Sequence, residues 1–317
     1  MVTATTAFAK PFVDIPALIR AKGQAQAAGK ECLACEGHQV VTLSPKIRDR
    51  DNFSVVGCSQ CGLSHLEPFP AQMAAYYRQD YREDTNPDIL AVRAGCAEDN
   101  ARRCDTLLPR LGPNCRLLDF GCGSGAFLHA ARFRSQAQLA GIELHDAFRA
   151  HLRQEGFDVR PHLTDFKGSV FDIVLLSHVL EHTETPVQVL AELRQYLAPG
   201  GIVAIEVPSL TDALLWVYRI PAFWAFYWQF PHIWYFSPET LQAVIEQAGF
   251  RMERLEGMQR YGLMNHFQWL NEGRPGKGER FAPLVAGPMD EAYRAALIKQ
   301  GVFDTIWMEC TPRPISP

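Results

Sequence analysis

The sequence predicts an α/β protein whose main domain is a parallel sheet with helices on both faces, preceded by a small metal-binding module. From about residue 112, short apolar segments alternate with amphipathic segments of helical spacing. This alternation is typical of βαβ units and therefore of a parallel sheet. Near the N-terminus, two cysteine pairs are each separated by two residues, which is the spacing of tetrahedral metal sites.

Composition limits the possible partners and compartments. The 317 residues are 47% hydrophobic, enough for one large core and a small additional module. The net charge of -4 gives no general attraction for nucleic acid, so a nucleic-acid partner is unexpected. No apolar run reaches the length of about 18 residues that spans a membrane. The N-terminus lacks the apolar centre of a signal peptide, and nine cysteines then favour a reducing, cytoplasmic location.

The same patterns divide the chain into four parts. We expect residues 1–30 to form a loosely ordered arm and residues 31–66 to form a zinc-ribbon-like module. A helical linker or cap follows over residues 67–110, and the main α/β domain occupies residues 111–317. An insertion rich in aromatic residues interrupts that domain at about residues 210–236.

The cysteine pairs are Cys32 with Cys35 and Cys58 with Cys61, in the pattern C-x2-C-x22-C-x2-C. Each pair suits one side of a tetrahedral ion, and the intervening HQVVTL and FSVVG segments alternate like short strands. Four sulfur ligands close the coordination sphere, which predicts a structural rather than a catalytic zinc ion. The alternatives are reduced thiols without metal, or substitution of one ligand by His38 or His65.

A glycine-rich turn follows the first strand of the main domain. The segment LLDFGCGSG places Gly121, Gly123 and Gly125 directly after an apolar run, where sheets of this kind bind ligands. No Lys follows these glycines, which argues against an NTP-binding P-loop. A dinucleotide remains an alternative on spacing alone. However, Asp119 before the loop would repel a pyrophosphate and would attract a cationic ligand such as S-adenosylmethionine (SAM).

Taken together, LLDFGCGSG, GIEL, FDIVLLSHVLEH and LAPGG resemble the successive motifs of class I SAM-dependent methyltransferases, over roughly residues 111–256. The resemblance implies a Rossmann-like seven-stranded sheet that binds SAM, with the three loop glycines as the floor of the site. It implies that Glu143, at the end of the second strand, binds the ribose. Asp165 would lie near the adenine with Phe166 stacked beside it; the alternative is that both are ordinary loop residues.

The segment SHVLEHTETP supplies candidate catalytic residues on the acceptor side. It contains His178, Glu181 and His182, and the similar family segment HIWYFSPETL adds His232 and Tyr235, which would approach the acceptor. We expect one of the three histidines to act as the base, with His182 favoured. Structural roles for these histidines are the alternative. A second metal is unexpected because HVLEH is not the H-E-x-x-H pattern.

The aromatic-rich stretch over residues 216–241 has three alternative interpretations. It is broken by Pro221 and Pro231, so it is not a membrane-spanning helix. It is expected to be a lid over the acceptor pocket, a homodimer surface or a peripheral membrane contact.

A zinc module followed by this domain resembles methyltransferases of bacterial sugar and natural-product pathways, including zinc-bearing deoxysugar C-methyltransferases. Those enzymes are longer at the C-terminus, so we expect O-methylation of a sugar, a glycan or a natural-product intermediate. The alternatives are C-methylation of a nucleotide deoxysugar and methylation of an aromatic or lipid acceptor. An RNA methyltransferase and a non-catalytic SAM-binding protein are the hypotheses from other functional classes.

Overall fold

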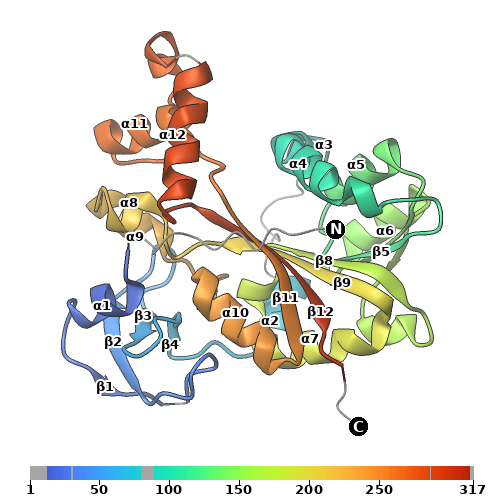
Figure 1. The fold of residues 1–317 in the computed structure, drawn as a ribbon, viewed down its shortest axis with the longest axis horizontal. Coiled ribbons are helices and arrows are strands. Elements are labelled where there is room, and N and C mark those ends of the chain that lie inside the picture. The colour runs from blue at the N-terminus through green and yellow to red at the C-terminus, as the bar shows by residue number, and fades with distance from the viewer. Residues whose placement is uncertain (1–12, 30, 80–88, 286, 315–317) are drawn as a thin grey trace. The chain divides into compact units, whose positions relative to one another are not determined.

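The structure is a computed structural model that describes residues 13–29, 31–79, 89–285 and 287–314. The chain forms two compact units (Figure 1). The ribbon unit comprises Met1–Pro70, Glu206–Ala248 and Met252–Met308, and the sheet unit comprises Ala71–Ile205, Gly249–Arg251 and Glu309–Pro317. Three strands (β9, β11 and β12) contribute residues to both units.

The main sheet has seven strands in the order β11-β12-β9-β8-β5-β6-β7, which confirms the predicted fold class. Their bounds are β5 Arg116–Phe120, β6 Gln138–Ile142, β7 Asp158–Arg160, β8 Phe171–Ser177, β9 Leu197–Pro208, β11 Phe250–Met258 and β12 Thr305–Pro312. Strand β5 pairs in parallel with β6 and β8, and β6 pairs in parallel with β7. Strands β5 and β8 are almost entirely buried, as their continuous apolar runs predict for a parallel sheet.

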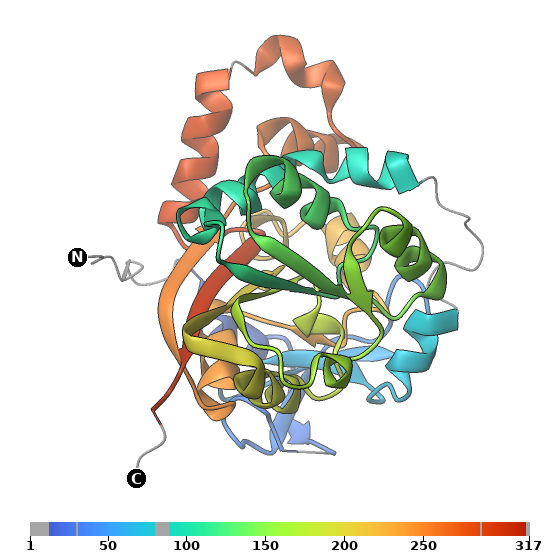
Figure 2. The same ribbon diagram turned by 90° about the vertical axis from the view of Figure 1, so that its right-hand side faces the viewer.

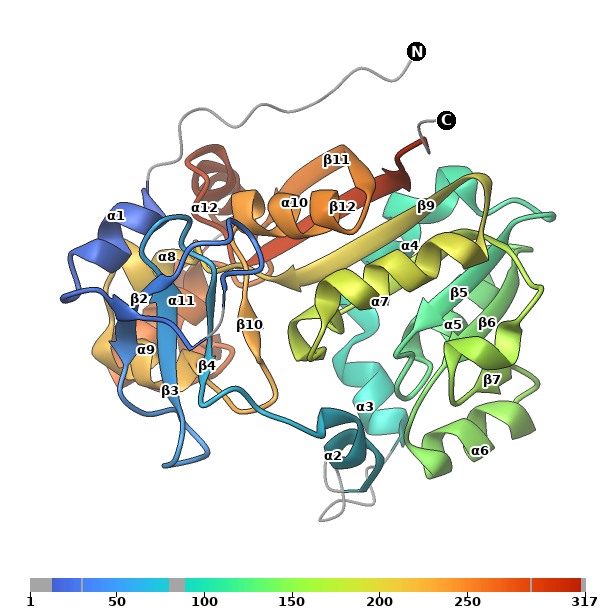
Figure 3. The ribbon, with the colours of Figure 1, turned by 90° about the horizontal axis from the view of Figure 1, so that it is seen from below.

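Helices lie on both faces of these strands, with α4 and α7 on opposite sides (Figures 2 and 3). The helices of the sheet unit are α2 Met73–Gln79, α3 Ile89–Gly95, α4 Ala97–Leu107, α5 Ala126–Arg134, α6 Asp146–Gln154 and α7 Pro186–Leu193. The first three fall within the expected helical linker. The glycines of LAPGG lie inside β9, which begins at Leu197.

A second, five-stranded sheet with the order β1-β2-β3-β4-β10 belongs to the ribbon unit. Its strands are β1 Gln26–Ala27, β2 Gln39–Ser44, β3 Ser54–Cys58, β4 Ser64–Glu67 and β10 Trp234–Tyr235. Strands β2 and β3 are the two strands expected between the cysteine pairs. Strand β10 comes from the aromatic-rich stretch and pairs with β4, placing Trp234 opposite His65 and Tyr235 opposite Ser64.

The expected N-terminal arm contains a helix within its described residues, 13–29. Helix α1 spans Ile15–Arg20, and the Asp14 side chain accepts a hydrogen bond from the backbone N–H of Ala17, as an N-cap does. Ile15 and Ile19 are buried in the core of the ribbon unit. Residues 13–20 therefore contribute to that core, which differs from a loosely ordered arm.

The insertion over residues 210–236, which holds most of the aromatic-rich stretch, supplies much of the same core. It contains α8 Ala213–Trp216 and α9 Pro221–Tyr227, and its rings pack against ribbon residues such as Val41, Val55 and Leu66. Trp228 and Tyr235 are fully buried. A small ribbon cannot bury a sufficient core by itself, and the aromatic stretch provides the missing apolar partner. Part of the stretch is therefore used in internal packing, and the lid, homodimer and peripheral membrane interpretations stay predictions.

The remaining helices of the ribbon unit are α10 Pro238–Gln247, α11 Leu263–Glu272 and α12 Gly287–Lys299. Within the described residues, no helix combines the length and apolar character needed to cross a membrane.

Candidate functional site

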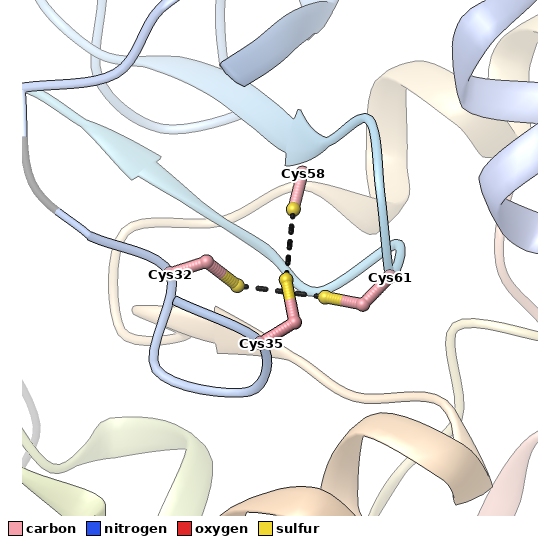
Figure 4. A group of neighbouring side chains, drawn as sticks. All are labelled: Cys32, Cys35, Cys58 and Cys61. Carbon is pink, nitrogen blue, oxygen red and sulfur yellow. Dashed lines mark hydrogen bonds between the residues drawn. The ribbon is translucent and has the colours of Figure 1, made fainter. Parts of the chain in front are cut away.

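The four predicted cysteines converge in the ribbon unit (Figure 4). The Sγ atoms of Cys32 and Cys61 are 3.4 Å apart, and those of Cys35 and Cys58 are 3.5 Å apart. All four sulfurs lie within 4.8 Å of one another. A tetrahedral zinc ion with Zn–S bonds of about 2.3 Å holds its sulfurs about 3.8 Å apart, so the cluster has the size of such a site.

Neither histidine alternative joins this cluster. The ring of His65 donates from Nδ1 to the carbonyl oxygen of Leu66 at 2.9 Å, and its ring lies against Trp234. His38 lies at the surface with Nε2 3.7 Å from Glu31 Oε1. Hydrogen bonds with Cys32 and then with Cys61 hold the pKa of Cys58 below its ordinary value, and thiol hydrogen bonds within the cluster raise the pKa of Cys32 and of Cys61. This is the pattern of one thiolate that accepts hydrogen bonds from neighbouring thiols.

In the sheet unit, the glycine loop lies between β5 and α5, at the carboxyl ends of the parallel strands. Gly121, Gly123 and Gly125 have φ angles of +77°, +53° and +73°, a region that favours glycine. A Cβ at Gly121 would lie 2.7 Å from Val179, and a Cβ at Gly125 would lie 2.2 Å from Leu152. A Cβ at Gly123 would meet nothing within 4 Å. Two of the glycines therefore permit packing, while Gly123 faces open space suited to a ligand.

Glu143 follows the end of β6 and reaches this loop. Its Oε2 accepts a hydrogen bond from the backbone N–H of Gly123 at 2.7 Å, and its Oε1 accepts one from His145 N–H at 2.7 Å. Each carboxylate oxygen has lone pairs for two hydrogen bonds, so both oxygens retain capacity for a further donor. The carboxylate is thus fixed beside Gly123, with acceptor capacity for a pair of hydroxyl groups.

Asp119 lies beneath the loop in β5 and is 3% exposed. Burial raises the pKa of this carboxyl to about 7; the nearby Arg103 opposes the rise, and Glu143 adds to it. A buried acid that ionises near neutral pH is an unfavourable choice for stability alone, and such groups are common at functional sites.

We expect Asp119→Asn to stabilise the free protein at pH 8. The folded pKa of about 7 exceeds the ordinary 3.8, so the protonated acid favours folding below pH 3.8, and this contribution disappears as the pH rises towards 7. The shift corresponds to at most about 4 kcal/mol. Urea unfolding between pH 4 and 8 should show a decline in wild-type stability that the variant lacks. Glu192→Gln, at an exposed position of α7, is the control and should show the same decline as the wild type. An equal decline in Asp119→Asn and in the wild type would contradict the raised pKa of Asp119.

Asp165 and Phe166, which the resemblance places near the adenine, differ in their surroundings. Asp165 is exposed, and its Oδ2 accepts a hydrogen bond from His162 N–H at 3.0 Å, which caps the short helix Leu163–Phe166. Phe166 is buried, and its ring packs edge-on against Phe171. Asp165 therefore stays available at the loop surface. The Phe166 ring packs in the core.

On the acceptor side, a buried carboxylate connects the two predicted histidines. Glu181 is 1% exposed, and its Oε1 lies 3.3 Å from His178 Nδ1 and 3.8 Å from His182 Nε2. His182 Nδ1 lies 2.8 Å from the hydroxyl of Tyr77. His178 has a φ of +53°, uncommon for a residue other than glycine. It directly precedes Val179, which packs against Gly121, so this segment adjoins the glycine loop.

His232 and Tyr235 belong to the ribbon unit. Tyr235 is buried, and its hydroxyl accepts from the backbone N–H of Gln229 at 2.9 Å and donates to Gln229 O at 3.2 Å. His232 lies beside the same glutamine, with Nε2 3.0 Å from Gln229 Nε2. These contacts give both residues local partners within the aromatic-rich stretch.

Three further residues of the sheet unit were not assigned from the sequence. Arg93 in α3 donates to Ser124 O in the glycine loop and pairs with Glu155, and Tyr77 contacts His182. Nothing in the local pattern distinguishes Arg93 from other helical arginines, because its partners lie 31 and 62 residues away.

Part of this chain is similar to known proteins. Residues 93–255 match the family model described as "Methyltransferase domain". The ubiquinone biosynthesis O-methyltransferase of Cereibacter sphaeroides is 28% identical over 167 residues, covering 49% of this chain and 66% of that protein. The tRNA U34 carboxymethyltransferase of Pseudoalteromonas translucida is 32% identical over 118 residues, covering 32% of this chain and 35% of that protein. The chain thus spans just under two thirds of the first relative and about a third of the second.

Among solved structures, a SAM dependent methyltransferase from Archaeoglobus fulgidus is 19% identical, with a TM-score of 0.46. The likeness covers 68% of this chain and 93% of that one.

Proposed function

The chain belongs to the class I SAM-dependent methyltransferases, and we propose that it transfers a methyl group to an oxygen of a small molecule, a sugar, glycan or natural-product intermediate. The observation that carries the proposal is the fixed juxtaposition of Gly123, Glu143 and His178 at the carboxyl ends of neighbouring strands. One curated relative named as an O-methyltransferase supports oxygen as the acceptor atom.

The residues present suit SAM. The open space above Gly123 accommodates close backbone approach, and the Glu143 carboxylate is placed to accept hydrogen bonds from two ribose hydroxyls. Ionised Asp119 would favour the positively charged methionine portion, and exposed Asp165 would approach the adenine. When bound, SAM supplies the electrophilic methyl group, so the protein's task is positioning and removal of the acceptor proton.

The contacts described above support His178 as the base, whereas the sequence pattern favoured His182. His182 has Tyr77 beside Nδ1 and Glu181 beside Nε2, and it is 15% exposed. His178 is 27% exposed and donates from Nδ1 to the buried Glu181 carboxylate. That bond leaves Nε2 as the basic nitrogen, and Glu181 stabilises the imidazolium that forms when the acceptor proton arrives.

We propose that the four cysteines hold a structural zinc ion. The sulfur-only ligand set and the spacing of the four Sγ atoms fit zinc and leave no position for substrate. The ion would hold the end of β3, at Cys58, to the turn that carries Cys32 and Cys35.

The test is an acceptor screen that measures S-adenosylhomocysteine (SAH) formation from SAM with nucleotide sugars, free glycans and phenols. For the best acceptor, we expect His178→Ala to lower kcat by about 100-fold or more while SAH binds normally. His182→Ala, the matched control, should have a smaller effect. A larger loss of kcat in His182→Ala than in His178→Ala would identify His182 as the base. SAM binding without turnover of any acceptor would favour the non-catalytic alternative, and turnover of RNA alone would overturn the small-molecule proposal.

A further inference from the structure

We propose that Arg93 is a positioning residue for cofactor binding, which holds the backbone of the glycine loop in its receptive shape from helix α3. This inference rests on the proposed function, because it concerns the site that would bind SAM. Arg93 lies outside the strand, loop and helix motifs that indicate that site, and 31 residues separate it from its contact in the loop.

The Arg93 guanidinium makes three hydrogen bonds and is 12% exposed. Nε donates to Ser124 O at 2.8 Å, Nη1 donates to Glu155 Oε1 at 2.9 Å and Nη2 donates to Glu155 Oε2 at 2.7 Å. The pairing with Glu155 is bidentate, which fixes both the position and the plane of the guanidinium. The Nε donor is thereby aimed at one carbonyl group of the loop.

That carbonyl belongs to a peptide group held at both ends. In the peptide between Ser124 and Gly125, the oxygen accepts from Arg93, and the Gly125 N–H donates to Cys122 O at 2.8 Å. The peptide between Cys122 and Gly123 is also held, because its Gly123 N–H donates to Glu143 at 2.7 Å. Glu143 and Arg93 therefore restrain the loop from its two sides.

Such restraint is needed because this loop is glycine-rich. Gly123 and Gly125 both adopt positive φ angles that the free chain leaves readily, since glycine has the widest conformational choice. A loop that must be ordered on binding weakens affinity by the cost of ordering it, and preorganisation removes that cost. Arg93 supplies part of this preorganisation from outside the loop.

Glu155 holds the Arg93 guanidinium in place through both of its carboxylate oxygens. It is the C-cap residue of α6, where a negative charge is unfavourable to the helix dipole, so helix stability does not account for it. His129 Nε2 lies 2.9 Å and His151 Nε2 3.3 Å from its carboxylate oxygens. The hydrogen bond from Arg93, followed by that from His129, lowers the pKa of Glu155 to about 2, and the carboxylate therefore stays ionised at neutral pH.

The geometry requires arginine rather than any cation. A lysine ammonium provides donors from a single atom and cannot reproduce a bidentate carboxylate pair together with a third, divergent bond. Arg93→Lys should therefore keep the charge and lose most of the positioning.

The experiment is calorimetric titration of SAH into wild-type protein, Arg93→Ala, Arg93→Lys and Glu155→Gln. The matched control is Arg134→Ala, because Arg134 also links two helices, through Ala101 O and Asp105, without contact to the glycine loop. Hydrogen–deuterium exchange of peptides covering residues 121–126 is measured in the absence of ligand. Thermal unfolding verifies that each variant is folded.

We expect Arg93→Ala to weaken SAH binding by on the order of tenfold or more, as for the loss of a charged hydrogen bond. Arg93→Lys should lose nearly as much affinity and Glu155→Gln less. Exchange in residues 121–126 should accelerate in the Arg93 variants but not in Arg134→Ala. If Arg93→Ala does not fold, the SAH affinity and the hydrogen–deuterium exchange of Arg93→Lys test the positioning role instead.

Wild-type affinity and wild-type exchange in a folded Arg93 variant would overturn the positioning role. An equal loss of SAH affinity in Arg134→Ala would do the same, since it would indicate general destabilisation. Failure of the wild-type protein to bind SAH would instead contradict the proposed function, so the two failures are distinguishable.

Discussion

Glu143→Ala is expected to weaken SAH binding by about 100-fold, since two hydrogen bonds from ribose hydroxyls to a charged acceptor are lost. The structure adds a second reason. The same carboxylate accepts from the backbone N–H groups of Gly123 and His145, so its removal also releases the loop that carries the open space for the ligand. Calorimetric titration of SAH measures the change directly.

Two variants make this result interpretable. Glu143→Gln keeps an oxygen acceptor but loses the charge, and we expect an affinity between those of the wild type and the alanine variant. Glu192→Ala removes an exposed glutamate from α7 and should bind SAH normally. If folded Glu143→Ala bound SAH as tightly as the wild type, the cofactor would not lie at the glycine loop.

The second large effect is expected from loss of the cysteine cluster. Purified protein should contain one zinc ion per chain, and Cys58→Ser should lose it and lower the Tm by about 10 °C or more, because metal binding contributes directly to folding. The ribbon shares its core with the aromatic-rich stretch, including Trp228 and Tyr235. Tryptophan emission should therefore shift to longer wavelength when the metal is lost.

Cys96→Ser is the matched control. Its thiol lies outside the cluster and donates to the backbone carbonyl of Val92 at 3.0 Å, so its zinc content and Tm should stay close to wild type. Treatment of the wild type with a strong chelator should reproduce the emission change of Cys58→Ser. A protein that contains no zinc, and whose stability is unaffected by Cys58→Ser, would contradict a structural metal site.

Much of the site could be predicted from the sequence because its signals are local. The glycines, Asp119 and Glu143 occupy fixed offsets from strand ends, and the parallel sheet brings those ends to one edge. The cysteine pairs could also be recognised, because the two-residue spacing within each pair is a local pattern. Phe166 could not be assigned in this way, because an aromatic residue in a loop can face either a ligand or the core. Its packing against Phe171 in the structure places it in the core.

The sequence by itself determined the alternation of strands and helices, the cysteine cluster and the glycine loop with its acids, since each depends on spacing within a short segment. Tertiary structure alone decided which distant groups complete them. It joined the aromatic-rich stretch to the ribbon through β10, brought Tyr77 to His182, and brought Arg93 to Ser124. Burial and hydrogen bonding between segments far apart in the chain decide these contacts, and no local pattern encodes them.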